Sequence, residues 1–211
     1  MISEMLKKFY SNGNESQKQY GFALQCAFLV FRFSQLKMAM MEDNAVLDSS
    51  LLSDHILCSN IHANGNMSDE EYDVYETLNQ EMQANVNGRP WNGLPDLIIY
   101  IKISPEKEVK EIMKRGREME LSPDLVEYYH SVNDAYDRWY KGYVGAPVIK
   151  IDRDKFDYVN NLKDRKYVLH QITHRLYQLG KLNYAQITEL DHKLDNLKLT
   201  PVSLDGTEVD N

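Results

Sequence analysis

The sequence is poor in cysteine, in positive charge and in long apolar runs, and each shortage excludes a class of protein. Cys26 and Cys58, its two cysteines, form no CxxC pair and cannot build a disulfide framework, so we expect free thiols in a reducing compartment. Asp and Glu outnumber Lys and Arg by 32 to 24, and the net charge of −8 argues against nucleic acid as a partner. The longest apolar run, residues 22–31, is too short to span a bilayer. Residues 1–10 hold no apolar signal segment, so we expect a cytoplasmic protein without a membrane partner.

Helices and strands are predicted to alternate along the chain. Residues 17–41 are apolar almost all round at helical spacing, which is typical of a helix buried on several sides. Further helices are predicted from about residue 51, from a Ser68/Glu71 capping box, from Ser104-Pro105, from Ser122-Pro123 and over 161–180. Short apolar runs at 45–48, 97–103 and 148–151 are typical of buried strands. The pattern predicts an α/β fold in which helices flank a small parallel sheet of about three strands.

The chain length suits one domain with an appendage. We expect residues 1–181 to form the domain and residues 182–198 to form a C-terminal helix, because Leu190, Leu194 and Leu197 recur at helical spacing. Residues 199–211 show no pattern and are expected to be disordered.

Charge is concentrated where Arg115-Gly116-Arg117 is followed by Glu120. The planar fork of arginine suits phosphate oxygens, and a glutamate can accept hydrogen bonds from sugar hydroxyls. The alternative is a solvated helix end, where cations favour the negative pole of the helix dipole.

Five segments, in this order, resemble the deoxynucleoside kinase family, particularly the bacterial deoxyadenosine and deoxyguanosine kinases. They are FALQCAFLVFRF (22–33), NAVLDSSLLSD (44–54), LPDLIIYIKISPE (94–106), KRGREMEL (114–121) and IDRDKFDYV (151–159). The resemblance covers roughly residues 3–165 and implies a three-layer fold like that of phosphate-loop kinases, but truncated.

The resemblance implies that one set of polar residues binds a purine deoxyribonucleoside or nucleotide. Gln25 and Arg32 would lie on the substrate helix, where an amide can both donate to and accept from a base edge. Asp54 would complete the recognition of that edge. Tyr10 and Glu120 would meet the 3′-hydroxyl of the sugar. Each of these residues taken singly has an alternative interpretation as an ordinary polar side chain, a salt-bridge partner or a ring at the edge of the core.

A second set is implied to serve the phosphate donor. Arg115 and Arg117 would be lid residues that stabilise charge on the transferred phosphoryl group. Asp152, Asp154 and Phe156 would lie in the loop that packs on the donor adenine.

The sequence departs from the family on the side of phosphoryl transfer. It contains no GxxxxGK[ST], so the lysine and hydroxyl that hold phosphates and Mg²⁺ are missing, together with the expected general base. Ser49 stands where the family has an arginine. We therefore predict no certain cofactor, with ATP and Mg²⁺ needed only if another chain completes the site.

Three functions remain open at this point. The first is a degenerate, kinase-like binding or regulatory subunit, a pseudoenzyme that forms a homodimer or pairs with a kinase-family chain. The second is one part of a split, ATP-dependent deoxynucleoside kinase. The third is an interaction scaffold that binds no ligand.

A metal site is not predicted. His170 and His174 are four residues apart on one face of a predicted helix, but the sequence places no carboxylate ligand with them. A structural pair is the favoured interpretation.

Overall fold

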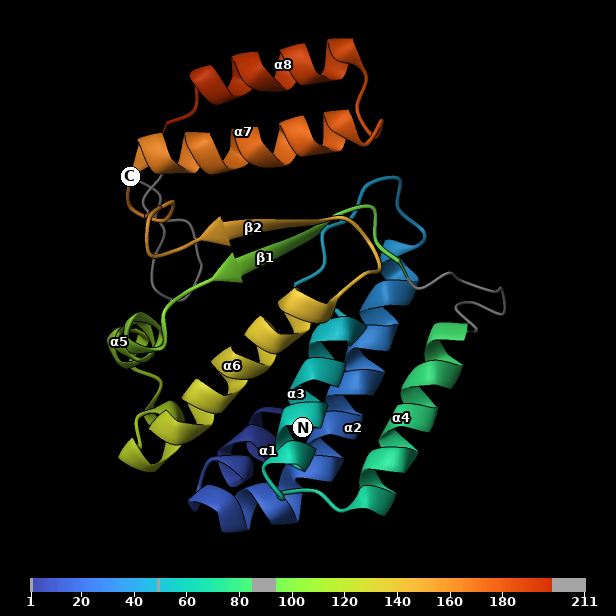
Figure 1. Ribbon diagram of the computed structural model, residues 1–211, viewed down its shortest axis with the longest axis vertical. Coiled ribbons are helices and arrows are strands. Elements are labelled where there is room, and N and C mark those ends of the chain that lie inside the picture. The colour runs from blue at the N-terminus through green and yellow to red at the C-terminus, as the bar shows by residue number, and fades with distance from the viewer. Residues whose placement is uncertain (1, 49, 85–93, 199–211) are drawn as a thin grey trace. The chain divides into compact units, whose positions relative to one another are not determined.

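The computed structural model describes residues 2–48, 50–84 and 94–198 (Figure 1). Within these residues the helices are α1 (Ile2–Phe9), α2 (Gly13–Ala39), α3 (Leu51–Ala63), α4 (Asp69–Ala84), α5 (Pro105–Arg115), α6 (Val126–Gly142), α7 (Leu162–Gln178) and α8 (Tyr184–Asp195). The strands are β1 (Ile98–Lys102) and β2 (Val148–Asp152), and short 3₁₀ turns cover Glu118–Glu120 and Pro123–Leu125. The chain divides into two compact units, each of which is described by itself.

The first unit is helical and holds the largest apolar core. It comprises the described parts of residues 1–93 and 112–143, in which α2 packs against α1, α3 and α4, and α3 packs against α6. Gly21 lets α2 approach α3 closely, because a Cβ there would lie 3.2 Å from Ile61 Cγ2. The core side chains are Phe9, Leu24, Leu29, Leu36, Leu51, Cys58, Ile61, Met67 and Tyr75.

The beginnings of α3 and α4 follow from local capping. Ser50 Oγ accepts a hydrogen bond from Ser53 N at the start of α3. Ser68 Oγ accepts from Glu71 N, and Glu71 Oε2 accepts from Ser68 N, which confirms the predicted capping box. Such caps satisfy backbone N–H groups that have no partner inside the helix.

The second unit contains the sheet and comprises residues 94–111 and the described part of 144–211. β1 and β2 pair in parallel, with Ile98 opposite Val148 and Lys102 opposite Asp152. α7 contacts β2 on one side and packs against α8 on the other (Figure 1). The helix predicted over 182–198 is therefore present as α8, Tyr184–Asp195.

The predicted α/β class with a small parallel sheet is confirmed, but the strand predicted near 45–48 is wrong. Among the described residues the sheet has two strands, and residues 45–48 have no strand conformation. Val46 is 92% exposed, so the apolar run does not mark a buried strand. The physical reason is that a strand requires a hydrogen-bonded neighbour, which a short apolar run cannot supply by itself.

Two positions singled out from the sequence, the tail over 199–211 and Ser49, lie outside the described residues, so the expectations about them are not tested. Among the described residues, no helix has the length and apolar character needed to cross a membrane. α2 does expose apolar side chains, including Val30, Phe31 and Met38. Self-association therefore stays a prediction, which light scattering can check.

Candidate functional site

The ion pair between Arg32 on α2 and Asp54 in the first turn of α3 is the centre of the candidate site. Arg32 Nε lies 3.1 Å from Asp54 Oδ1, and the Asp54 side chain is fully buried. Arg32 Nη1 also donates to the carbonyl of Ser50, at 3.3 Å, immediately before α3. The arginine thus joins α2 to the start of α3, and its guanidinium lies 5.3 Å from the centre of the Phe28 ring.

Several buried polar atoms near this pair lack hydrogen-bond partners in the described part of the chain. They are Gln25 Oε1, Asp54 Oδ2 and the Tyr75 hydroxyl, whereas Asp54 Oδ1 is engaged by the ion pair with Arg32. Gln25 is seven residues before Arg32, or about two helical turns, so the two share a face of α2. Leaving a buried acceptor unpaired costs roughly 1–3 kcal/mol, which proteins rarely tolerate without reason. The pattern indicates a place for a polar ligand.

Burial controls the ionisation of Asp54. Burial raises the pKa of its carboxyl group to about 7, while the Arg32 guanidinium opposes that shift. Burial also raises the pKa of Tyr75 far above its ordinary value, and the Asp54 charge is the next cause. Asp54 and Tyr75 are therefore electrostatic neighbours at the α2–α3 face.

Glu120 forms a second polar centre in the same unit. Its carboxylate receives a hydrogen bond from Arg115 and lies 3.5 Å from Arg117 Nη1. Its backbone carbonyl accepts a 2.8 Å hydrogen bond from the Tyr129 hydroxyl. Burial raises the pKa of Tyr10 to about 12, and the Glu120 charge adds to that effect. The structure therefore brings Tyr10, Glu120, Arg115 and Arg117 close together; their roles at a sugar and at a phosphate stay predictions.

Tyrosines that sequence reasoning missed lie around these two centres. The Tyr10 and Tyr128 rings are 6.2 Å apart between centroids, in an edge-to-face arrangement. Burial raises the pKa of Tyr128, with Tyr10 and then Tyr129 and Tyr136 as further causes. Burial likewise raises the pKa of Tyr136, whose charged neighbours include Arg32 and Asp54. Tyr128 and Tyr136 are eight residues apart on α6, and this spacing was the one sequence signal that could have placed both tyrosines near the site.

The loop predicted to meet a donor base belongs to the second unit, and its carboxylates are engaged within that unit. Asp154 accepts from Ser104 N at 2.9 Å and from Ser104 Oγ at 3.0 Å. The Ser104 hydroxyl thus donates to Asp154, and the predicted N-cap role of Ser104 at α5 stays a prediction. Asp152 lies 3.3 Å from Lys155 Nζ, and the Phe156 ring packs on Tyr167 with centroids 4.7 Å apart.

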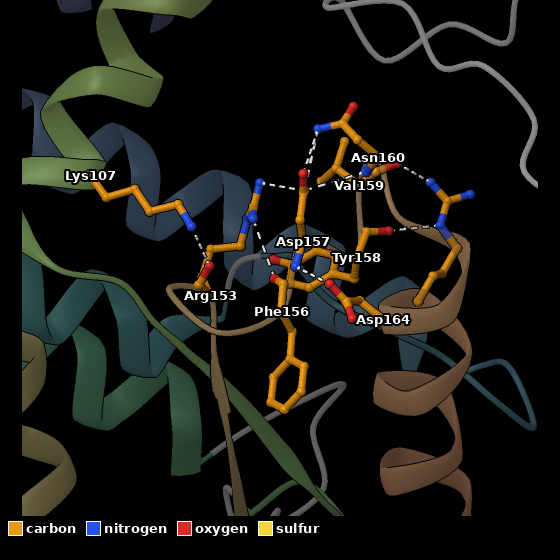
Figure 2. A network of polar contacts seen from close by, with 9 residues as sticks. Lys107, Arg153, Phe156, Asp157, Tyr158, Val159, Asn160 and Asp164 are labelled. Atoms are coloured by element: carbon orange, nitrogen blue, oxygen red, sulfur yellow. Dashed lines mark hydrogen bonds and ion pairs between the residues drawn. The ribbon is translucent and has the colours of Figure 1, made fainter.

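Arg153, which sequence reasoning also missed, holds this loop together (Figure 2). Its guanidinium bonds Asp157 Oδ1 at 3.0 Å and the Phe156 carbonyl at 3.3 Å. Its own carbonyl accepts a 2.6 Å hydrogen bond from Lys107. The Asp157 backbone N–H donates to Asp164 at 2.9 Å, which connects the loop to the first turn of α7. Arg153 is 7% exposed, so its role is to shape the loop.

Comparison with known proteins identifies a family for this chain. A family model described as deoxynucleoside kinase matches residues 1–177. A deoxyguanosine kinase of Lactobacillus johnsonii is 36% identical over 180 residues, which cover 84% of this chain and 78% of the relative. A deoxyadenosine kinase of Lactobacillus acidophilus is 35% identical over 172 residues, covering 80% of this chain and 79% of the relative.

Solved structures agree at the level of fold. A deoxyadenosine kinase from M. mycoides with bound dATP superposes with a TM-score of 0.63 and 23% identity, covering 79% of each chain. The same kinase with products dCMP and dCDP has a TM-score of 0.58 and 21% identity, covering 93% of this chain and 84% of that chain.

Proposed function

This chain belongs to the deoxynucleoside kinase family, and from that premise we propose that it binds a purine deoxyribonucleoside or its nucleotide. The base edge would meet Gln25, Arg32 and Asp54 at the α2–α3 face. The sugar would meet Tyr10 and Glu120. The names of the relatives support this substrate class, since they are deoxyguanosine and deoxyadenosine kinases.

The single observation that carries the proposal is the set of buried acceptors without hydrogen-bond partners. Gln25 Oε1 and the ionised Asp54 Oδ2 are acceptors, so a ligand that satisfies them presents N–H or O–H donors. The exocyclic amine of a purine presents such donors, and the Gln25 amide can at the same time donate to a ring nitrogen. Arg32 supplies the positive charge that keeps Asp54 able to accept.

Glu120 supports the sugar end of the proposal in a different way. Its carboxylate contacts both Arg115 and Arg117. A sugar hydroxyl would donate to the same carboxylate, and a phosphate group would compete for the arginines. The pKa of Tyr10, raised partly by the Glu120 charge, is consistent with a tyrosine close to that hydroxyl position.

The residues implied to serve the phosphate donor make contacts within the chain. Arg115 and Arg117 are both engaged by Glu120, and Asp152 and Asp154 are engaged by Lys155 and Ser104. These 211 residues also carry no GxxxxGK[ST]. We therefore propose binding without phosphoryl transfer by these residues alone, as a regulatory subunit or a dimer partner. In the alternative, a phosphate loop from outside these residues completes a kinase that uses ATP and Mg²⁺.

The first test is calorimetry of the purified chain against deoxyribonucleosides and their nucleotides. Gln25→Leu should weaken binding of the preferred ligand by about 1–3 kcal/mol, because the base edge loses its amide partner. Glu120→Gln should weaken binding by a similar amount, because a charge-assisted hydrogen bond to the sugar becomes a neutral one.

Matched controls separate these effects from general damage. Gln19→Leu changes an exposed glutamine on the same helix, and Glu118→Gln changes an exposed glutamate in the same 3₁₀ turn. Both controls, and any change of His170, should leave the affinity as it is. Absence of binding for every nucleoside and nucleotide would contradict the proposal and favour the scaffold function.

The second test concerns catalysis. The chain by itself should show no deoxynucleoside-dependent consumption of labelled ATP, because loss of charge stabilisation at the phosphoryl group costs orders of magnitude in rate. A turnover of about 1 s⁻¹, which ordinary kinases reach, would contradict this prediction. Activity that appears only when a chain with a phosphate loop is added would establish the split enzyme.

A further inference from the structure

A three-residue cluster on the α7–α8 pair has no part in the nucleoside proposal. Among the described residues, His170, His174 and Asp191 are a set whose ligand atoms all lie within 4.8 Å of one another. His170 Nδ1 is 3.0 Å from Asp191 Oδ1, and His174 Nε2 is 3.4 Å from the same oxygen. The two imidazole rings are 6.0 Å apart between centroids. The sequence had placed no carboxylate with this histidine pair, and the structure corrects that expectation.

Local structure explains why these residues meet. His170 and His174 are four apart on α7 and so share one face. α7 ends at Gln178, and Gly180 follows two residues later with a φ of +69°, which favours glycine. Gly180 N donates to Tyr177 O, and Lys181 N donates to Leu176 O. α8 then begins at a capping box formed by Asn183 and Gln186. This short connection directs α8 back along α7 (Figure 1). Asp191 on α8 thereby comes beside the two histidines.

The distances suit a metal ion. Zn²⁺ binds imidazole nitrogen and carboxylate oxygen at about 2.0–2.2 Å, so neighbouring tetrahedral ligands lie about 3.3–3.5 Å apart. The two His–Asp separations of 3.0 and 3.4 Å are close to that spacing, and the two imidazole nitrogens lie within 4.8 Å of each other, so side-chain rotation would close the set around an ion. The three side chains are also partly open, with 32%, 54% and 34% of their surfaces exposed, so an ion and its water can enter.

We propose that His170, His174 and Asp191 form a binding site for a divalent transition-metal ion, with Zn²⁺ the ion that the ligands fit best. Imidazole and carboxylate ligands suit Zn²⁺, and three protein ligands leave a fourth position for water. The bound ion joins α8 to α7 across the connection at Gly180. Its consequence is a more stable α7–α8 pair, because an ion that binds the folded chain favours the folded state.

The experiment uses the full chain without a histidine tag, stripped of metal, and titrates Zn²⁺ by calorimetry. The expected result is one ion per chain. Asp191→Asn keeps the size of the side chain but removes its charge. It should weaken Zn²⁺ binding by at least the roughly 10–100-fold that loss of an outer-shell partner costs metal sites. His170→Ala and His174→Ala should do the same. His192→Ala is the matched control, because His192 is an exposed histidine on α8 outside the cluster.

Hydrogen exchange provides a second measurement that does not depend on the affinity. Zn²⁺ should slow exchange of the α8 amides in the wild-type chain and in His192→Ala, but not in Asp191→Asn. Mg²⁺ at the same concentration should have no effect, since it prefers oxygen ligands. The proposal is overturned if the stripped chain binds no Zn²⁺, or if His192→Ala weakens binding as much as the cluster variants. Circular dichroism of each variant establishes that the helices are intact.

Discussion

Replacing Arg32 with methionine should lower the free energy of unfolding by about 3–5 kcal/mol, as is usual when one partner of a buried ion pair is removed. The Asp54 side chain is fully buried, and its Oδ1 lies 3.1 Å from Arg32 Nε. The effect is expected at a pH above about 7, where the Asp54 carboxyl group is ionised and loss of the guanidinium would leave a buried negative charge without the positive group that offsets it. Methionine keeps much of the apolar volume, so the loss would report on charge and not on packing.

Urea denaturation of four proteins would test this expectation. They are the wild type, Arg32→Met, Asp54→Leu and the double variant. Replacing both partners by apolar residues is often neutral or stabilising, so the double variant should recover much of the stability that Arg32→Met loses. The matched control is Lys37→Met, which removes a cation further along the same helix. Equal losses for Arg32→Met and Lys37→Met, or no recovery in the double variant, would contradict the prediction.

The stability of the chain should fall as the pH rises from about 4 to about 7, through the contribution of Asp54. The pKa of this group is raised by burial from 3.8 to about 7 in the folded chain. Between these values the folded chain binds the proton and the unfolded chain does not, so acid favours folding and base opposes it. Above pH 7 the carboxyl group is ionised in both states and the dependence from this residue ends. A difference of about three pKa units corresponds to roughly 4 kcal/mol.

Asp54→Asn isolates this contribution. The amide does not titrate, so subtracting its stability curve from that of the wild type removes the contributions of all other groups. The difference curve should decline across the window from about pH 4 to pH 7 and be flat above it. Asp124→Asn, which makes the same substitution at an exposed position, serves as the control for the change from carboxylate to amide. A difference curve for Asp54 that rises with pH would show that Arg32 outweighs burial.

Most of the helices could be predicted from the sequence because their signals are local. The capping box at Ser68 and Glu71 lies within four consecutive residues. The strand predicted at 45–48 failed for the opposite reason. A short apolar run indicates that a segment could be buried, whereas a strand forms only where another segment supplies backbone hydrogen bonds. β1 and β2 are each other's hydrogen-bonded neighbour, although 45 residues lie between Lys102, the last residue of β1, and Val148, the first residue of β2.

The candidate sites divide in the same way. By itself the sequence determined the α/β class, the helical face that carries Gln25 and Arg32, and the spacing of His170 and His174, because each depends on residues within a few helical turns. Only the tertiary structure decided that Arg32 meets Asp54, that Tyr75 and Tyr136 lie beside that pair, and that Asp191 joins the two histidines. Those contacts join different helices. The packing of the helices determines which side chains meet, and the residue spacing along one helix does not predict those contacts.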